Sequence, residues 1–148
     1  MKPELTSFRG SCHCGNVEIV FESALKAEEL PVRACACSFC RRHGALSTSD
    51  PKGSVKIAIH DSSRLIRYRF GLKTADFLIC KRCGVYLAAV MAAGGKSYAV
   101  VNINTLDFRE RFRKEPATVS YDGESEAERI ARRKANWTPV IAFSEQAG

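Results

Sequence analysis

The residues best able to do chemistry in this chain are its seven cysteines, which fall into three short groups. The groups are Cys12 and Cys14; Cys35, Cys37 and Cys40; and Cys80 and Cys83. Disulfide frameworks usually spread their cysteines along a chain, whereas metal ligands come in CxC and CxxC pairs whose thiolates converge on one ion. Seven thiols divide naturally into four and three. This division predicts one closed zinc site and a second site with a vacancy, at which chemistry can occur.

The first and last groups each place a glycine directly after the second cysteine, in CHCG from Cys12 and CKRCG from Cys80. Glycine permits a positive φ and a close approach of the backbone to sulfur in a metal-binding turn. We expect these two turns to share one structural zinc through Cys12, Cys14, Cys80 and Cys83. Such a site would tie the N-terminal region to a later strand and contribute to folding stability.

The middle group, CACSFC from Cys35 to Cys40, lets a single loop bring three thiols to one ion. The fourth ligand position could take water, a substrate or a histidine, of which His43 is the nearest candidate and His13 and His60 are less conveniently placed. Three thiolates make zinc a poorer Lewis acid than neutral histidines do, but they suit it to bind and exchange a fourth thiolate. The middle group therefore suggests a thiol substrate.

Alternation of apolar and polar residues predicts that strands position these groups, in a mainly β fold. The alternating segments are 17–22, 55–59, 66–70, 75–79 and 98–103. The three successive segments 55–59, 66–70 and 75–79 predict antiparallel pairing. Hairpin loops are expected at 71–74 and 94–96. Ser125 and Glu128 are typical of a capping box that opens a short C-terminal helix through about Asn136, and Pro139 prevents its continuation. We interpret this helix as structural rather than catalytic.

The length of 148 residues and the 45% hydrophobic content predict a single domain over residues 1–148. Met1–Gly10 lacks the apolar segment of a signal peptide and Val85–Ala93 is too short to cross a bilayer, so we expect no membrane partner and a cytoplasmic location. Free thiols persist in the reducing cytosol, which agrees with metal binding. The net charge of +7 favours an anionic partner, but no basic run has the length of a nucleic-acid tail, so nucleic acid is not favoured.

The cysteine groups belong to longer motifs, which are GSCHCG from Gly10, CACSFCRRHG from Cys35 and ICKRCG from Ile79, and NINTLD follows from Asn102. Together, over about residues 10–107, these four motifs resemble the glutathione-dependent formaldehyde-activating enzyme family. The resemblance implies a β-tent fold of antiparallel sheets, shared with methionine-R-sulfoxide reductases, and two zinc ions. It also implies the same division of ligands as the count: Cys12, Cys14, Cys80 and Cys83 hold the structural zinc, and Cys35, Cys37 and Cys40 hold the catalytic zinc.

The resemblance further implies an activity, that of a carbon-sulfur lyase similar to S-(hydroxymethyl)glutathione synthase. In this activity a zinc-bound thiol such as glutathione adds to formaldehyde or another aldehyde. Arg41 and Arg42 flank the second zinc site and are candidates for bidentate pairing with the carboxylates of the thiol peptide, or else for ordinary surface charge. The apolar stretch from Val85 to Met91 differs from what we associate with characterised members, so the aldehyde and thiol do not follow from the fold.

Several alternatives stay open at this point. The stretch from Val85 to Met91 could line the second zinc or be an ordinary buried strand, and Trp137 is interpreted as a packing residue. A non-catalytic zinc-binding module for nucleic acid or protein, as in the similar domain of centromere protein V, would need no open coordination site. A sulfoxide reductase of the same fold would need a redox cysteine, which Cys35–Cys40 could supply without a metal.

Overall fold

A computed structural model describes residues 4–147 of the chain. In this part of the chain the strands are β1 (Thr6–Ser11), β2 (Val17–Ser23), β3 (Arg33–Cys35), β4 (Ser47–Thr48), β5 (Ser54–Ile59), β6 (Leu65–Tyr68), β7 (Asp76–Cys80), β8 (Tyr86–Ala93), β9 (Lys96–Asn102), β10 (Ala117–Val119) and β11 (Thr138–Glu145). The helices are α1 (Ser38–His43) and α2 (Glu126–Asn136), with 3-10 turns η1 (Ser62–Arg64), η2 (Ile103–Thr105) and η3 (Arg109–Arg111). The expectation of a mainly β fold is confirmed.

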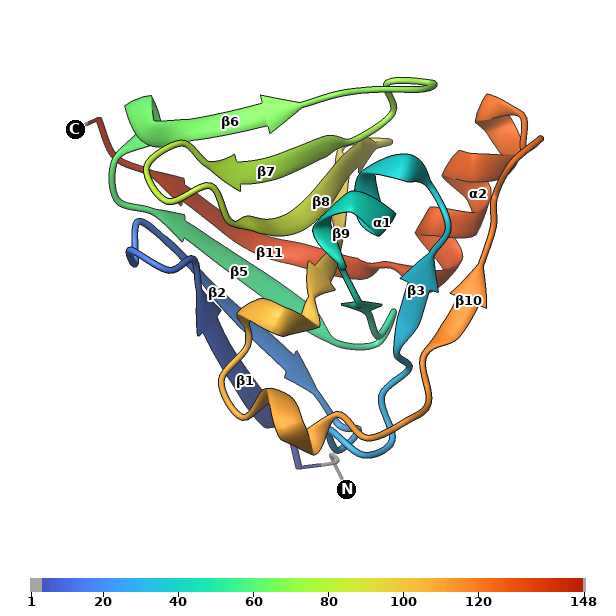
Figure 1. Ribbon diagram of the computed structural model, residues 1–148, viewed down its shortest axis with the longest axis horizontal. Helices are drawn as coiled ribbons and strands as arrows, with labels where there is room; N and C mark the ends of the chain where they lie inside the picture. Colours follow the sequence, from blue (N-terminus) through green and yellow to red (C-terminus); the bar gives the residue numbers. More distant parts are fainter. Residues whose placement is uncertain (1–3, 148) are drawn as a thin grey trace.

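The strands form one bent sheet with a branch. Its order is β1-β2-β5-β11-β9-β4-β3-β10, and β8, β7 and β6 extend from β9. In Figure 1 the branch lies along the top, β5, β2 and β1 descend at the lower left, and β3, β10 and α2 stand together on the right. Most pairs are antiparallel, but β11 runs parallel to β5 and β10 runs parallel to β3.

The main core lies between the two arms of this bent sheet. Its side chains come from alternate positions of β2 and β5, where Ile19 pairs with Ile57 in the ladder. They pack with residues of the other arm, including Leu78, Leu87 and Val101. Because full burial of one large aliphatic side chain stabilises a fold by about 1.5–3 kcal/mol, this interdigitated layer holds the arms together.

A second, smaller core forms under α2. Ala89, Val100 and Trp137 belong to it, with Ile130 of the helix packed against it. Their neighbours in sequence on β8 and β9 belong to the main core instead, since successive residues of a strand face opposite sides. α2 therefore covers the outer face of β8 and β9.

The capping box that the sequence predicts is present. Ser125 Oγ accepts a hydrogen bond from the Glu128 N–H at 3.1 Å, and Glu128 Oε1 accepts one from the Ser125 N–H at 3.0 Å. α2 ends at Asn136, before Pro139, as expected. The chain does not finish on this helix, however, because β11 follows it and completes the sheet.

The pairing predicted for three successive strands is right for one pair and wrong for the other. β6 pairs with β7, and β8 pairs with β9, through the two expected hairpin loops. β5 does not pair with β6, because β2 occupies one of its edges and β11 the other. β11 is far from β5 in the sequence, so no pattern in neighbouring segments predicts that the two strands pair. Within residues 4–147, no helix has the length and apolarity needed to span a membrane.

Candidate metal centres and the adjoining cavity

Four cysteines from two distant turns meet at one point. The Sγ atoms of Cys12, Cys14, Cys80 and Cys83 all lie within 4.8 Å of one another. Cys14 Sγ is 3.7 Å from Cys12 Sγ and 3.6 Å from Cys80 Sγ. A tetrahedral zinc with Zn–S bonds of about 2.3 Å requires sulfurs about 3.8 Å apart, whereas a disulfide bond is only about 2.05 Å long. The spacing therefore fits a closed four-sulfur metal site.

The two turns that carry these cysteines share a backbone pattern. The Cys12 N–H donates to the Val17 carbonyl at 3.0 Å and the Gly15 N–H donates to the Cys12 carbonyl at 3.1 Å. The turn that begins at Cys80 repeats this arrangement, with corresponding distances of 2.9 and 2.8 Å. Gly15 and Gly84 have φ angles of 84° and 80°, which confirms that the turns need glycine there.

The surroundings of this site favour the neutral form of Cys12 and Cys80 and the ionised form of Cys83. Burial raises the pKa of Cys12 to about 12 and raises the pKa of Cys80. For Cys83, burial acts in the same direction but is outweighed by hydrogen bonds, beginning with the Val85 N–H, which lower the pKa to about 6. Four thiolates so close together need a cation to ionise as a group, and a dication such as Zn²⁺ supplies that charge.

The middle cysteines gather where β3 passes into α1. Cys35 ends β3, Cys37 is the N-cap of α1, and Cys40 lies within that helix. Their three Sγ atoms lie within 4.8 Å of one another, and no further His, Cys, Asp or Glu among the described residues joins them. Phe39 fixes the helix against the sheet, with its ring centroid 4.8 Å from that of Phe77 and 5.0 Å from that of Tyr86.

Hydrogen bonds among the three middle thiols shift their pKa values in different directions. Hydrogen bonds from Cys35 and Cys40 lower the pKa of Cys37. The hydrogen bond to Cys37 raises the pKa of Cys35, and hydrogen bonds to Cys35 and Cys37 raise the pKa of Cys40. A cluster of three soft sulfur ligands suits a soft or borderline cation such as zinc.

A cavity of about 230 Å³ adjoins this three-sulfur cluster. Besides Asp122, Asn136 and small or aliphatic residues, its lining contains the cysteines Cys35, Cys37 and Cys40, the aromatic residues Phe70, Phe77, Tyr86, Tyr121 and Trp137, and the arginines Arg33, Arg129, Arg132 and Arg133. The cysteines of the four-sulfur site are not part of this lining. One cluster therefore lies outside the cavity, and the other adjoins a space that can hold a small molecule.

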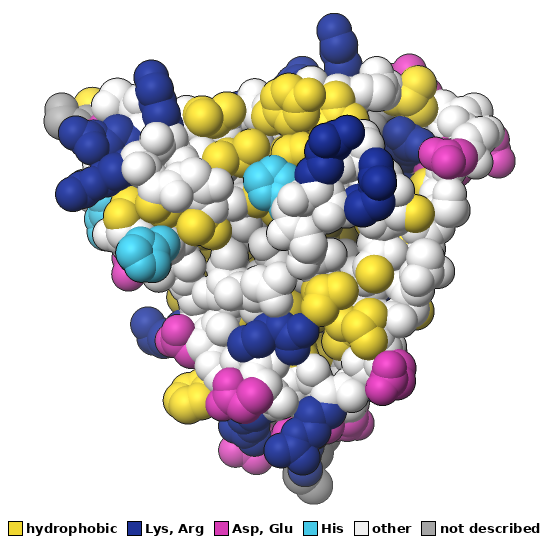
Figure 2. Space-filling view, in the orientation of Figure 1, with side chains coloured by type: hydrophobic (Ala, Val, Ile, Leu, Met, Phe, Trp, Pro, Cys, Tyr) yellow, Lys and Arg dark blue, Asp and Glu magenta, His cyan; other side chains and the backbone are white. Residues whose placement is uncertain are grey.

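Arg41, Arg42 and His43 occupy the last turn of α1, are exposed, and lie outside the cavity lining. The His43 ring packs on Phe39 at 4.5 Å between centroids, so an aromatic contact already accounts for its position. Figure 2 shows Lys and Arg side chains beside a hydrophobic patch on the face where α1 and β6 lie. The proposed roles of Arg41 and Arg42 in binding stay predictions, while other arginines line the cavity.

β8 serves both the core and the cavity. Leu87 and Ala88 belong to the main core, whereas Tyr86 and Ala89 line the cavity. The apolar stretch thus contributes residues both to the buried core and to the cavity that adjoins the three-sulfur cluster. Burial raises the pKa of Tyr86 well above its usual value, so its hydroxyl stays protonated in the cavity wall. The signal available in the sequence was this single hydroxyl within an apolar strand, which sequence reasoning missed.

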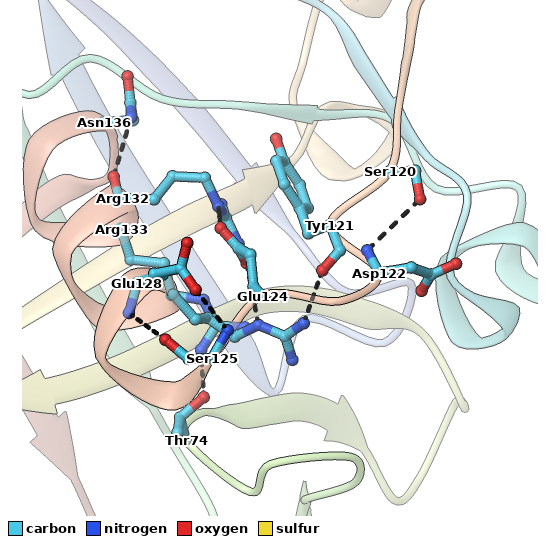
Figure 3. A network of polar contacts seen from close by, with 11 residues as sticks. Thr74, Ser120, Tyr121, Asp122, Glu124, Ser125, Glu128, Arg132, Arg133 and Asn136 are labelled. Atoms are coloured by element: carbon cyan, nitrogen blue, oxygen red, sulfur yellow. Dashed lines mark hydrogen bonds and ion pairs between the residues drawn. The ribbon is translucent and has the colours of Figure 1, made fainter.

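Sequence reasoning also missed the contribution of α2. The Arg132 guanidinium binds Glu124 with two hydrogen bonds of 2.8 and 3.0 Å, and Arg129 adds a third at 3.1 Å (Figure 3). Arg133 lies over the ring of Trp137, at 4.6 Å from its centroid. The helix interpreted as structural, and the tryptophan interpreted as packing, both line the cavity. The sequence signal was the spacing of 129, 132 and 133, which places these residues on one side of a helix.

Comparison with known proteins agrees with this geometry. Residues 7–121 match the family model described as glutathione-dependent formaldehyde-activating enzyme. A crystal structure of a Rhodobacter sphaeroides protein is similar, with 30% sequence identity and a TM-score of 0.56, and the match covers 75% of this chain and 99% of that chain. A search of curated proteins finds no match. The family match includes all seven cysteines and leaves α2 and β11 outside it.

Proposed function

Because the chain belongs to the glutathione-dependent formaldehyde-activating enzyme family, we propose that it is a zinc-dependent carbon-sulfur lyase that joins a thiol such as glutathione to an aldehyde. The observation that supports this most directly is the asymmetry of the two cysteine clusters. The three-sulfur cluster faces the cavity, and the four-sulfur site does not. An open set of three ligands beside a cavity is the arrangement expected of a catalytic zinc, and a closed set of four that of a structural zinc.

The residues present fit two zinc ions. The four sulfurs of one site have the spacing of a tetrahedron, and the three sulfurs of the other are close enough to share one ion. When bound at the three-sulfur cluster, zinc supplies a positive charge that lowers the pKa of a substrate thiol. Cys35, Cys37 and Cys40 would hold that ion, and Cys12, Cys14, Cys80 and Cys83 would hold the structural ion.

The proposed reaction is an addition that needs no oxidant or reductant. A bond forms between the thiol sulfur and the aldehyde carbon, the π bond of the carbonyl breaks, and the proton of the thiol ends on the former carbonyl oxygen. The Tyr86 hydroxyl lines the same cavity and stays protonated, so it can donate a hydrogen bond to that oxygen as negative charge develops there. The rings of Phe70 and Phe77 make part of the wall apolar and limit the water around the reacting groups.

The state of the cysteines supports a reducing compartment for this activity. All seven are free thiols in the described structure. We infer a cytoplasmic location, because exposed and half-buried thiols such as Cys14 and Cys40 persist where glutathione keeps them reduced. Glutathione is then also available as the thiol substrate.

The proposal is tested with zinc-loaded protein, glutathione and formaldehyde. Two quantities are measured. The first is the amount of zinc bound per chain, and the second is the rate of hemithioacetal formation, which exchange NMR compares with the rate of the spontaneous reaction. We expect two zinc ions per chain and a rate above the spontaneous one. Cys37→Ser should abolish the rate enhancement. Ser38→Ala is the control, because Ser38 is the neighbouring residue and is exposed, and this variant should leave the rate unchanged. A protein with both zinc ions that accelerates the addition of glutathione to neither formaldehyde nor a larger aldehyde would contradict the proposal.

A further inference from the structure

Two of the arginines in the cavity wall have no carboxylate partner within residues 4–147. Arg129 and Arg132 share the carboxylate of Glu124. Arg33, by contrast, donates from Nη1 to Ser49 Oγ at 2.8 Å, and Arg133 donates from Nη1 to Thr74 Oγ1 at 2.7 Å. Both of these partners are neutral hydroxyls. Arg33 and Arg133 thus line the cavity without a bonded carboxylate, and Glu124 and Cys35 act on the charge of Arg133 only from a distance.

Burial makes these two charges unusual. The Arg133 side chain is only 8% exposed, and its Nε is buried without a hydrogen-bond partner. Burial lowers the pKa of Arg33, and it lowers the pKa of Arg133 to about 10, so both groups remain charged at neutral pH. Removing a charge from water without pairing it is costly, and the contact with the Trp137 ring offsets only part of this cost. A site that retains such a cost is suited to an anion that arrives from outside.

The other charges around the cavity leave room for an anion. Asp122 lines the cavity and is exposed, and it is the acidic residue of the lining. Glu124 is already shared between two arginines, and the three-sulfur cluster interacts favourably with Arg133 through Cys35. With four arginines in the lining, the positive charge still exceeds these negative groups.

We propose that Arg33 and Arg133 form a carboxylate-binding subsite in the cavity that adjoins the three-sulfur cluster. A guanidinium group offers two parallel N–H donors at the spacing of a carboxylate, and two such groups can hold one carboxylate or a dicarboxylate. The substrate that reacts at the cluster accordingly carries a carboxylate. The part of this proposal that concerns reaction rests on the proposed function, whereas binding of the carboxylate does not.

The subsite draws on two parts of the chain. Arg33 lies on β3, inside the region that matches the family, and Arg133 lies on α2, outside it. β3 pairs with β10, and α2 follows β10 in the chain, so that all three lie in the same region of the molecule (Figure 1). The C-terminal segment of this chain thereby determines which substrates the cavity of the family fold accepts.

A carboxylate could belong to the thiol or to the aldehyde, and two arms of one experiment separate these sources. In the first arm, calorimetry compares the binding of mercaptoacetate and 2-mercaptoethanol to the zinc-loaded protein, since these thiols differ in a carboxylate against a hydroxymethyl group. In the second, glyoxylate and acetaldehyde compete with formaldehyde in the glutathione reaction. We expect a preference of about tenfold or more for the carboxylate compound in at least one arm, as two charge-assisted hydrogen bonds provide.

The variants R33Q and R133Q should each remove most of that preference without weakening binding of the uncharged compound. R113Q is the matched control, because Arg113 is exposed and is not part of the cavity lining. If R133Q does not fold, R133K and R33Q carry the test, since a lysine keeps the charge but loses the two-pronged donor. Equal binding of the charged and uncharged compounds by the wild type in both arms would overturn the proposal.

Three further outcomes test the subsite, and the last two of them also separate it from the proposed function. If R133Q lowers zinc affinity but retains the carboxylate preference, Arg133 only balances the charge of the sulfur cluster and the subsite proposal is wrong. A protein that prefers mercaptoacetate but accelerates no thiol addition keeps the subsite and loses the enzyme function. A protein that catalyses the addition without any carboxylate preference keeps the enzyme function and loses the subsite.

Discussion

Cysteine sulfur is the ligand in both clusters, and its surroundings decide what each cluster can do. Cys12 and Cys80 are fully buried, with 1% and 0% exposure, inside turns that already use their backbone hydrogen bonds. Cys35, Cys37 and Cys40 are half-buried and border the cavity. Under the proposed function, the same thiolate chemistry would serve stability in one place and the reaction with substrates in the other.

The variant Cys80→Ser should unfold the protein or lower its Tm strongly, whereas Cys37→Ser should change the Tm little. The first substitution removes one of four ligands that join two distant turns, and structural zinc in small sites contributes folding free energy of about 10 kcal/mol or more. Circular dichroism and zinc analysis on both variants provide the check. A Cys80→Ser protein with wild-type Tm and two bound zinc ions would show that the four-sulfur site is not structural.

Replacing Tyr86 with phenylalanine should lower kcat about 10- to 100-fold and leave KM for the thiol nearly unchanged. The hydroxyl would act on charge that develops on the aldehyde oxygen, and one such donor is worth about 2 kcal/mol or more in a dry site. Tyr98→Phe is the control, since Tyr98 packs against the second core and not in the cavity lining. Equal kcat values for Tyr86→Phe and the control would remove Tyr86 from the mechanism.

At the scale of elements, α2 is held in place by an ion-pair cluster at its start. The hydrogen bond from Arg132 has the largest effect on the pKa of Glu124 and lowers it, burial opposes this shift, and the hydrogen bond from Arg129 lowers the pKa further. Arg132 also lies over the Tyr121 ring at 3.4 Å from its centroid. Glu124 thereby connects the loop after β10 to the helix that forms one wall of the cavity (Figure 3).

Glu124→Gln should destabilise the protein by about 1 kcal/mol at neutral pH, as expected of a partly buried ion pair. Since the folded-state pKa is depressed, the contribution of Glu124 is present above its ordinary pKa of 4.5 and is lost as the pH falls through the folded pKa. The Tm difference between wild type and variant should therefore shrink below about pH 4.5. Thermal unfolding of wild type and variant is measured in parallel, because both lose metal in acid and this loss then cancels in the comparison. A Tm difference that does not change with pH would contradict the role of Glu124 as an ion-pair partner.

The elements differ in how far the sequence could predict them. The alternation in β2 and β5, the two hairpins and the capping box of α2 are local patterns, and the structure confirms them. The cysteine turns were also recognisable, because the CxCG and CxxCG spacings fix the backbone locally. The cavity wall could not be predicted from the sequence, because it depends on the pairing of β3 with β10, which are far apart in the chain. Such a long-range pairing leaves no local sequence pattern.

The same reason explains the missed arginines. Arg41 and Arg42 follow the cysteines directly in sequence, but the helix turns them outwards to solvent. Arg33 and Arg133 are a hundred positions apart in sequence and line one cavity. Proximity to a motif along the chain is thus a poor guide to the composition of a cavity that distant segments build together.

At the scale of the whole molecule, the two metal sites should differ in how they lose zinc. A chelator can bind a metal ion at the cavity cluster through its free ligand position, whereas at the four-sulfur site it must displace four protein ligands, two of them on the fully buried Cys12 and Cys80. Treatment with EDTA should remove one zinc ion quickly without unfolding and the second slowly together with loss of structure. A colorimetric zinc assay followed in parallel with circular dichroism tests this sequence of events, and release of both ions at one rate would contradict it.

The position of the four-sulfur site in the chain has a consequence for biosynthesis. All four of its ligands have left the ribosome once Cys83 emerges, whereas β10, α2 and β11 are synthesised later. A nascent chain can thus lock its first two strands to β7 with a metal ion while the cavity still lacks a wall. Assembly in this order would form the scaffold site before the reactive pocket, which closes only after α2 has been synthesised.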